Sequence, residues 1–238
     1  MKIAGKTDIG QVRSTNQDTF HIEIFDKGTA LVLVCDGMGG VRGGDKASLL
    51  AKEAAASAVR QRLAASGPHE LLTEAVHAAN CAVLDEARRE PGFAGMGTTL
   101  VAALLTPALA CIAHVGDSRL YLLRGGRLTQ ITRDHSRVQE LIEAGKITRE
   151  EAWRHPDRNV ITRAVGVERQ VEADLQDLPL ERGDKLLLCT DGLSGYCAEG
   201  EIAQALGRLP AEDAVEELVR LANAAGGYDN ITAAVAEI

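Results

Sequence analysis

Short apolar strands occur in two blocks along this sequence, and each block is accompanied by a pair of helical segments. The first block ends with the run TALVLVCDG and is followed by two alanine-rich segments with helical apolar spacing, at about 46–63 and 68–89. The second block is followed by the helical stretches EIAQAL and AEDAVEELVRLANAA. Because most links between the strands have hairpin length, we predict an α+β fold with antiparallel sheets and helices packed outside them.

The segment from TTLVAALL to RLTQIT predicts an antiparallel meander of consecutive strands. Residues 134–159 then interrupt the strands with two short, charged helical signals. The first ends at Gly145, and the second begins with a capping box of Thr148 and Glu151. We interpret 134–159 as a flap inserted into a single domain spanning residues 1–238, because no repeat or low-complexity linker divides the chain.

Charge and cysteine content narrow the class of protein. The net charge of −8 and the lack of Lys/Arg clusters argue against a nucleic-acid partner. The five cysteines are odd in number and widely spaced, which predicts buried, reduced thiols. The start of the chain has no apolar signal core, and no apolar run reaches membrane-spanning length. We therefore expect a cytoplasmic protein without a membrane partner.

Aspartate recurs next to glycine where apolar strands end. The pairs are Asp36-Gly37, Gly116-Asp117 and Asp191-Gly192, and Asp229 stands in a glycine-rich turn before the last strand. One such pair is explained by turn formation alone, but three pairs together with the aspartate of a glycine-rich turn suggest carboxylates gathered at one edge. Gathered carboxylates repel one another unless a cation neutralises them. Oxygen ligands favour Mg²⁺, Mn²⁺ or Ca²⁺ over Zn²⁺, with His114 and His135 as weaker candidate ligands.

A second candidate site lies near the N-terminus, where Arg13 precedes Asn16, Gln17 and Asp18. A guanidinium can bind phosphate through two hydrogen bonds, and the alternative is an ordinary surface arginine. Other phosphate chemistries lack their motifs: no cysteine is followed by arginine at the spacing of a cysteine-based phosphatase loop, and no Gly-Lys-Ser/Thr sequence occurs. The aspartate cluster is the one coherent active site that the sequence predicts.

Together these residues resemble the metal-dependent, or protein phosphatase 2C-type, protein phosphatases in their compact bacterial form. The resemblance covers nearly the whole chain. Its motifs occur in the family's order: TDIGxVRxxNQD (7–18), DGMGG (36–40) with GDKAS (44–48), GMGTT (95–99), VGDSR (115–119), LCTDGL (188–193) and GYDN (227–230). It implies a four-layer α-β-β-α sandwich, with two central antiparallel β-sheets flanked by helix pairs.

The resemblance also implies roles for individual residues. Asp36 bridges two Mn²⁺ or Mg²⁺ ions, the Gly37 carbonyl binds one of them, and Asp191 and Asp229 bind the other. A third and weaker ion is held with the help of Asp117.

The remaining implied roles concern water, substrate and protonation. Asp18 and Asn230 order metal-bound water, and Arg13 holds the substrate phosphate. A metal-activated water then hydrolyses phosphoserine or phosphothreonine without a phosphoenzyme. Met38 stands where some members have a histidine general acid, so no side chain is assigned to protonate the leaving oxygen.

The expected partners follow from the same resemblance. They are phosphorylated proteins, a cognate Ser/Thr kinase and its targets, bound by a monomer whose flap residues Arg137, Glu140 and Arg149 contact the phosphoprotein. The alternative for each flap side chain is a solvated helix surface. Two alternatives to the function also stay open: a binding protein that keeps the metals without cleaving, and a metallohydrolase of small phosphorylated metabolites.

Overall fold

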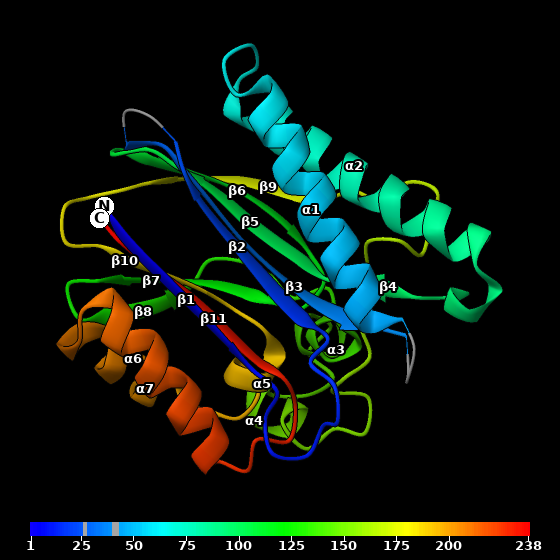
Figure 1. Cartoon of the computed structure of the whole chain (residues 1–238). Coiled ribbons are helices and arrows are strands. Elements are labelled where there is room, and N and C mark those ends of the chain that lie inside the picture. Colours follow the sequence, from blue (N-terminus) through cyan, green and yellow to red (C-terminus); the bar gives the residue numbers. More distant parts are fainter. Residues whose placement is uncertain (26–27, 40–42) are drawn as a thin grey trace.

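Two antiparallel sheets lie face to face at the centre of the computed structural model, which describes residues 1–25, 28–39 and 43–238 (Figure 1). Gly40 of the DGMGG motif is outside these ranges. The first sheet has the order β1 (Lys2–Asp8), β11 (Ile231–Glu237), β10 (Lys185–Cys189), β7 (Arg119–Arg124), β8 (Arg127–Gln130). The second sheet has the order β2 (Asp18–Ile24), β3 (Ala30–Met38), β5 (Leu100–Leu105), β6 (Leu109–Val115), β9 (Asp174–Pro179), and β4 (Gly97–Thr98) pairs with the end of β3.

Helix pairs cover the outer faces of both sheets. The pair α1 (Gly44–Arg62) and α2 (Pro68–Arg89) packs on the second sheet, and α6 (Glu199–Arg208) and α7 (Ala211–Ala224) pack on the first (Figure 1). Buried alanines at Ala47, Ala51 and Ala55 form one stripe of α1 facing the sheet. The predicted four-layer arrangement is confirmed.

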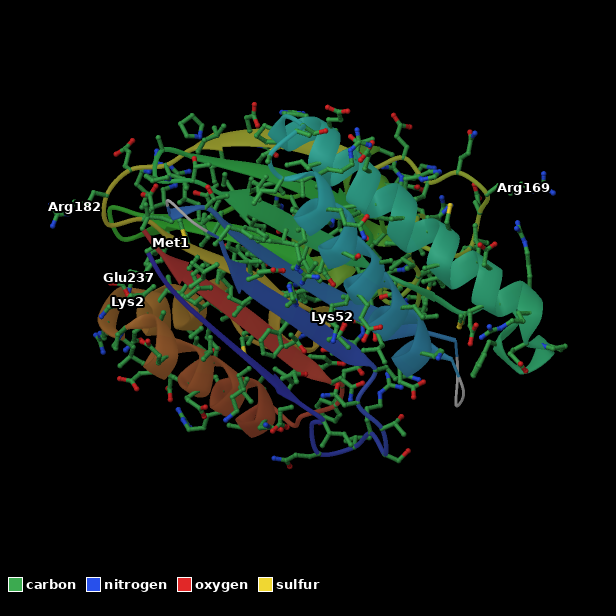
Figure 2. All side chains as sticks on the ribbon, turned by 45° about the horizontal axis from the view of Figure 1, so that its top comes forward. Met1, Lys2, Lys52, Arg169, Arg182 and Glu237 are labelled. Carbon is green, nitrogen blue, oxygen red and sulfur yellow. The ribbon has the colours of Figure 1, made fainter. Side chains whose placement is uncertain are left out.

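Alternation along β3 explains why this strand is apolar throughout. Leu31 and Leu33 belong to the core under α1 and α2, whereas Val32 and Val34 belong to the core between the sheets. Successive strand residues point to opposite faces, and here both faces are covered. The two ends of the chain lie next to each other in the first sheet. Lys2 on β1 and Glu237 on β11 are register partners and lie side by side (Figure 2).

The predicted four-strand meander is present as two antiparallel hairpins, β5–β6 and β7–β8, but the pairing between them is wrong. β6 pairs with β5 and β9 in one sheet, whereas β7 pairs with β8 and β10 in the other. The chain crosses between the sheets after Val115, where Gly116 has a φ of 107°. Such an angle is easily reached only by glycine, so this crossing needs Gly116.

β9 was not predicted because its residues are mostly exposed, as is common for an edge strand.

The flap segment contains the two predicted helices, α3 (Arg137–Glu143) and α4 (Arg149–Ala152). Gly145 follows α3 with a φ of 65°, and the capping box of Thr148 and Glu151 is present. An isolated bridge between Ser136 and Ile161 joins the two ends of the segment. Two further short elements are a 3₁₀ turn at Pro91–Phe93 and α5 (Asp191–Ser194).

All five cysteines are free thiols, as predicted, and four of them are buried while Cys81 is partly exposed. None of the helices in the described ranges combines the length and apolar character that a bilayer span requires.

Candidate active site

The aspartates at the strand ends meet in one cleft. Asp36 lies near the end of β3, Asp117 follows β6, Asp191 follows β10, and Asp229 precedes β11. All four line an open cleft of about 400 Å³, together with Arg13. The two sheets thus present these ends at the same side of the molecule, and the sequence prediction of gathered carboxylates is confirmed for the four residues.

Asp18 is directly opposite Asp36 in the β2–β3 register and is only 4 % exposed. The Thr190 hydroxyl donates a hydrogen bond to Asp18 Oδ2 at 2.8 Å. The other carboxylate oxygen, Oδ1, is buried and has no hydrogen-bond partner among the described residues. Burial raises the pKa of Asp18 to about 7, and the negative charges of Asp191 and Asp229 act in the same direction.

The carboxylates in the cleft disfavour one another's charged forms. Burial raises the pKa of Asp36 well above its usual value, and Asp18, Asp191 and Asp117 raise it further. Burial and then Asp191 also raise the pKa of Asp117, and burial raises that of Asp191. Converging carboxylate oxygens with raised pKa values are suited to a divalent cation, which would neutralise them.

Unsatisfied oxygen atoms show that the residues present fit such ions. Asp191 Oδ1, like Asp18 Oδ1, is buried without a hydrogen-bond partner in the part of the chain that the structure describes. An ionised oxygen without a donor is costly to bury, and metal coordination is one of the few ways to satisfy it. The donor set is entirely oxygen, which is the preference of Mg²⁺ and Mn²⁺.

Two threonines of the GMGTT motif hold the backbone of Asp36. The Asp36 N–H donates to Thr99 Oγ1 at 2.9 Å, and the Thr98 hydroxyl donates to the Asp36 carbonyl at 2.8 Å. Thr99 Oγ1 also lies 2.7 Å from the Ser118 hydroxyl, which adjoins Asp117. These contacts were not predicted from the residues. The motif itself was the only sequence signal that pointed to them.

The glycines beside the aspartates are required by close backbone contacts. A Cβ on Gly37 would lie 1.9 Å from the Gly44 carbonyl oxygen, and one on Gly192 would lie 1.9 Å from that of Asn230. Either contact is far inside the sum of van der Waals radii. The Asp-Gly pairs therefore bring β3 against the start of α1, and α5 against the turn before β11.

Arg13 and Asn230 lie where the loop after β1 meets this turn. Arg13 Nη2 donates to Asp229 Oδ2 at 2.7 Å, so the predicted phosphate-binding residue contacts a predicted metal ligand. The Asn230 side chain holds the loop: Oδ1 accepts from Gln17 N–H at 2.8 Å, and Nδ2 donates to the carbonyls of Ile9 and Thr15. Both amide hydrogens of Asn230 are thus used to position the loop.

His114 and His135 do not line the cleft. Their ring centroids are 4.8 Å apart behind the Gly116-Asp117 turn. Gly116 N–H donates to His135 Nδ1 at 3.1 Å, and His135 Nε2 lies 3.1 Å from Asp174 Oδ2. Burial lowers the pKa of His114 to about 4. The pair supports the turn that carries Asp117, in keeping with the weaker rank of these histidines as ligands.

The predicted flap residues are placed differently from one another. Arg137 and Glu140 pair with each other at 3.1 Å on α3, whereas Arg149 lines a broad hollow between the flap and the body. A narrower cavity connects the flap to the cleft, since its lining includes Asp117 and Asp191 together with the flap residues Trp153 and Arg158. Neither Trp153 nor Arg158 was singled out from the sequence.

Comparison with known proteins adds to this geometry. The family model described as protein phosphatase 2C matches residues 8–236. The chain belongs to the protein phosphatase 2C family. A putative protein phosphatase 2C-type protein from Streptococcus pyogenes is 43% identical over 99% of this chain and 96% of that protein.

Solved structures of other members of the protein phosphatase 2C family superpose on the whole chain. The serine/threonine phosphatase PstP/Ppp of Mycobacterium tuberculosis has a TM-score of 0.89 and 38% identity, covering 100% of this chain and 98% of that one. A catalytic-domain structure of PstP in complex with two manganese ions has a TM-score of 0.88 and 38% identity, covering 99% and 97%. A relative that is 38% identical to this chain thus binds manganese.

Proposed function

We propose that this protein is a metal-dependent phosphatase that hydrolyses phosphoserine and phosphothreonine in other proteins and so reverses Ser/Thr kinase signalling. The observation that carries the proposal is the single cleft lined by Asp36, Asp117, Asp191, Asp229 and Arg13. It combines oxygen ligands for divalent ions with a guanidinium for phosphate. Membership of the protein phosphatase 2C family supports the same reaction.

The proposed metal ligands are the aspartates at the strand ends. Asp36 would contribute to holding two ions, the Gly37 carbonyl would hold one of them, and Asp191 and Asp229 would hold the other. Asp117 contributes to a third and weaker ion, and either Mn²⁺ or Mg²⁺ fits the oxygen donors. The pKa values of Asp36, Asp117 and Asp191, raised chiefly by burial and further by neighbouring carboxylates, support these assignments.

The ions, when bound, supply a water activated at neutral pH and neutralise charge on the phosphoryl oxygens. The chain itself orients the reactants. Arg13 binds the substrate phosphate through its guanidinium N–H groups. Thr98 and Thr99 fix the backbone that carries Asp36, and Thr190 fixes Asp18, which orders water beside the cleft. Asn230 contributes by holding the loop that carries Arg13, in addition to the predicted ordering of water.

The wider setting of the activity is also proposed. The chain is one domain with a flap at 134–159, supported by three continuous hydrophobic cores that span the fold. It acts as a monomer in the cytoplasm on the targets of a cognate Ser/Thr kinase, and on the kinase itself. The free thiols support the cytoplasmic location. The flap contacts the phosphoprotein, and the cavity that joins it to Asp117 and Asp191 supports that role.

Hydrolysis of a phosphothreonine peptide with Mn²⁺, with Mg²⁺ and with EDTA tests the proposal, with Asp36→Asn as the control. We expect turnover that needs a divalent ion and is abolished by EDTA and by the substitution. A comparison with small phosphate esters tests the substrate class. Turnover of esters with none of the phosphopeptide would instead favour a metabolite phosphatase, and no turnover with any ion would favour a binding protein.

A further inference from the structure

A second group of metal-ligating side chains lies away from the active-site cleft. His69 is in the first turn of α2, Cys111 is in β6, and Asp177 is in β9. One ligand atom from each of them, an imidazole nitrogen, Sγ or a carboxylate oxygen, lies within 4.8 Å of the other two. We propose that His69, Cys111 and Asp177 form a Zn²⁺ site that is separate from the catalytic centre.

The three residues are brought together by the sheet and the helix above it. Cys111 and Asp177 are directly opposite each other in the β6–β9 register, so their side chains share one face. Cys111 belongs to the core beneath α1 and α2, and its thiol therefore faces the helices. His69 closes the group from above, with Nε2 2.9 Å from Asp177 Oδ1 (Figure 1 shows the elements).

Distances in this group are close to those of a tetrahedral zinc site. Bond lengths of about 2.3 Å to sulfur and 2.0 Å to nitrogen or oxygen place pairs of ligand atoms roughly 3.3 to 3.6 Å apart. The His69–Asp177 contact has to open slightly, and the contacts to Cys111 have to close by up to about 1.3 Å, to reach that range. His69 and Asp177 are about half exposed, so their side chains are free to make this adjustment.

The donor chemistry differs from that of the active site. Thiolate, imidazole and carboxylate together favour Zn²⁺, whereas the oxygen-only cleft favours Mg²⁺ or Mn²⁺. Asp117 follows Cys111 along the chain, and the four residue steps of the strand from Cys111 to Val115 alone span roughly 13 Å at the usual rise per residue, which keeps the two sites apart. Three protein ligands leave the fourth position for water. The bound ion would tie the edge strand β9 to α2.

Binding releases one proton for each ion. The thiolate is the form of cysteine that binds zinc, so the Cys111 thiol loses its proton to the buffer as the zinc–sulfur bond forms. Burial and the neighbouring Asp177 raise the pKa of Cys111 to about 12. Affinity for the ion therefore increases with pH, by about tenfold per unit below that pKa.

Co²⁺ titration of the Mn²⁺-loaded protein tests the site, because Co²⁺ bound to a thiolate gives a near-ultraviolet charge-transfer band that oxygen ligands do not give. We expect this band with a stoichiometry of one ion per chain, and its loss when Zn²⁺ is added. Substitution of a residue that only hydrogen-bonds to a metal ligand already weakens metal binding by about tenfold or more. His69→Ala, a substitution of a proposed ligand at an exposed helix position, should therefore weaken Co²⁺ binding by more than about tenfold. Cys111→Ser should abolish the band.

Cys81→Ser is the matched control. Cys81 Sγ is 3.7 Å from His77 Nε2 on α2, and among the residues that the structure describes no carboxylate joins this second thiol–imidazole pair in a group. Cys81→Ser should keep the charge-transfer band and the native affinity for Co²⁺. Absence of the band in the native protein, its loss in Cys81→Ser, or unchanged affinity in His69→Ala would each overturn the proposal. The last of these outcomes does not depend on whether Cys111→Ser folds.

Discussion

Arg13 donates a hydrogen bond from Nη2 to Oδ2 of Asp229 at 2.7 Å. Arg13 lies on the loop after β1, and Asp229 lies on the turn before β11, the strand that pairs with β1. Asn230 binds the backbone of the same loop at Ile9, Thr15 and Gln17. The phosphate-binding and metal-binding residues of the proposed site are therefore positioned by one pair of neighbouring strands.

Arg13→Ala should raise KM for a phosphothreonine peptide and lower kcat/KM by about 10- to 100-fold, the loss expected for a hydrogen bond to a charged group. The kcat/KM of Arg13→Lys should lie between those of the native protein and Arg13→Ala, because lysine keeps the charge but cannot donate two parallel hydrogen bonds. Steady-state kinetics at saturating Mn²⁺ measures both variants. Unchanged kinetics in Arg13→Ala would contradict the assignment.

Asp36→Asn should abolish detectable turnover, because it weakens the ligand proposed to bridge two ions. Asp117→Ala should reduce turnover more modestly and chiefly lower the affinity of the weakest ion. Asp45→Asn, at an exposed position in the first turn of α1, is the matched control and should keep both turnover and Mn²⁺ stoichiometry. Calorimetric Mn²⁺ titration with peptide assays measures these effects. Native-like Mn²⁺ binding in Asp36→Asn would rule out the bridging role.

Local patterns predicted most of the strands and helices, but not the way strands pair. β3 and β10 are apolar runs bounded by turns, and Pro68 marks the start of α2, so each could be predicted from a short window. The crossing at Gly116 between the sheets could not, because hairpin-length links allow strands to pair or to separate. β9 lacks an apolar pattern because it is an edge strand, so its identity depends on pairing with β6.

The sequence predicted the charged members of the cleft better than the neutral residues that support them. Four strand-end aspartates stand out as a repeated pattern in the sequence. Thr190 and Thr99 do not, because a threonine near a strand is explained by strand propensity alone. Their contacts with Asp18 and Asp36 join segments more than sixty residues apart, and only the folded chain reveals them.

Stabilisation by Mn²⁺ should be larger near pH 8 than near pH 5.5, because the raised pKa values of Asp18 and Asp36 make protons compete with the ion. Without metal, the folded carboxyls bind protons more tightly than the unfolded chain does. Their contribution to stability is thus present at low pH and is lost as pH rises through their folded pKa, about 7 for Asp18. Thermal unfolding with Mn²⁺ and with EDTA at both pH values measures the effect. An equal rise in unfolding temperature on adding Mn²⁺ at the two pH values would contradict this prediction.

Arg149→Ala should raise KM for a phosphoprotein by several-fold and leave a small phosphate ester unaffected, because Arg149 lines the hollow between the flap and the body. Arg88→Ala is the matched control: Arg88 pairs with Asp85 on α2, outside the flap, and this exposed pair is of small energetic value. Parallel kinetics on the two substrates separates flap contacts from chemistry. Equal effects of both variants on the phosphoprotein would remove Arg149 from the proposed contact surface.

Asn80→Ala should lower the free energy of unfolding by about 1 to 3 kcal/mol, the cost of leaving buried polar groups without partners. Asn80 is 1 % exposed on α2; its Oδ1 accepts from Gly166 N–H at 2.7 Å, and its Nδ2 donates to the Glu168 carbonyl at 3.0 Å. These bonds fix the segment that leads from Ile161, which lines the cleft, to β9. Urea unfolding measures the loss, with His77→Ala on the same helix as control. Because the segment also borders the active site, kcat should fall in Asn80→Ala even where the protein stays folded; native kcat would show that Asn80 stabilises α2 without positioning the cleft.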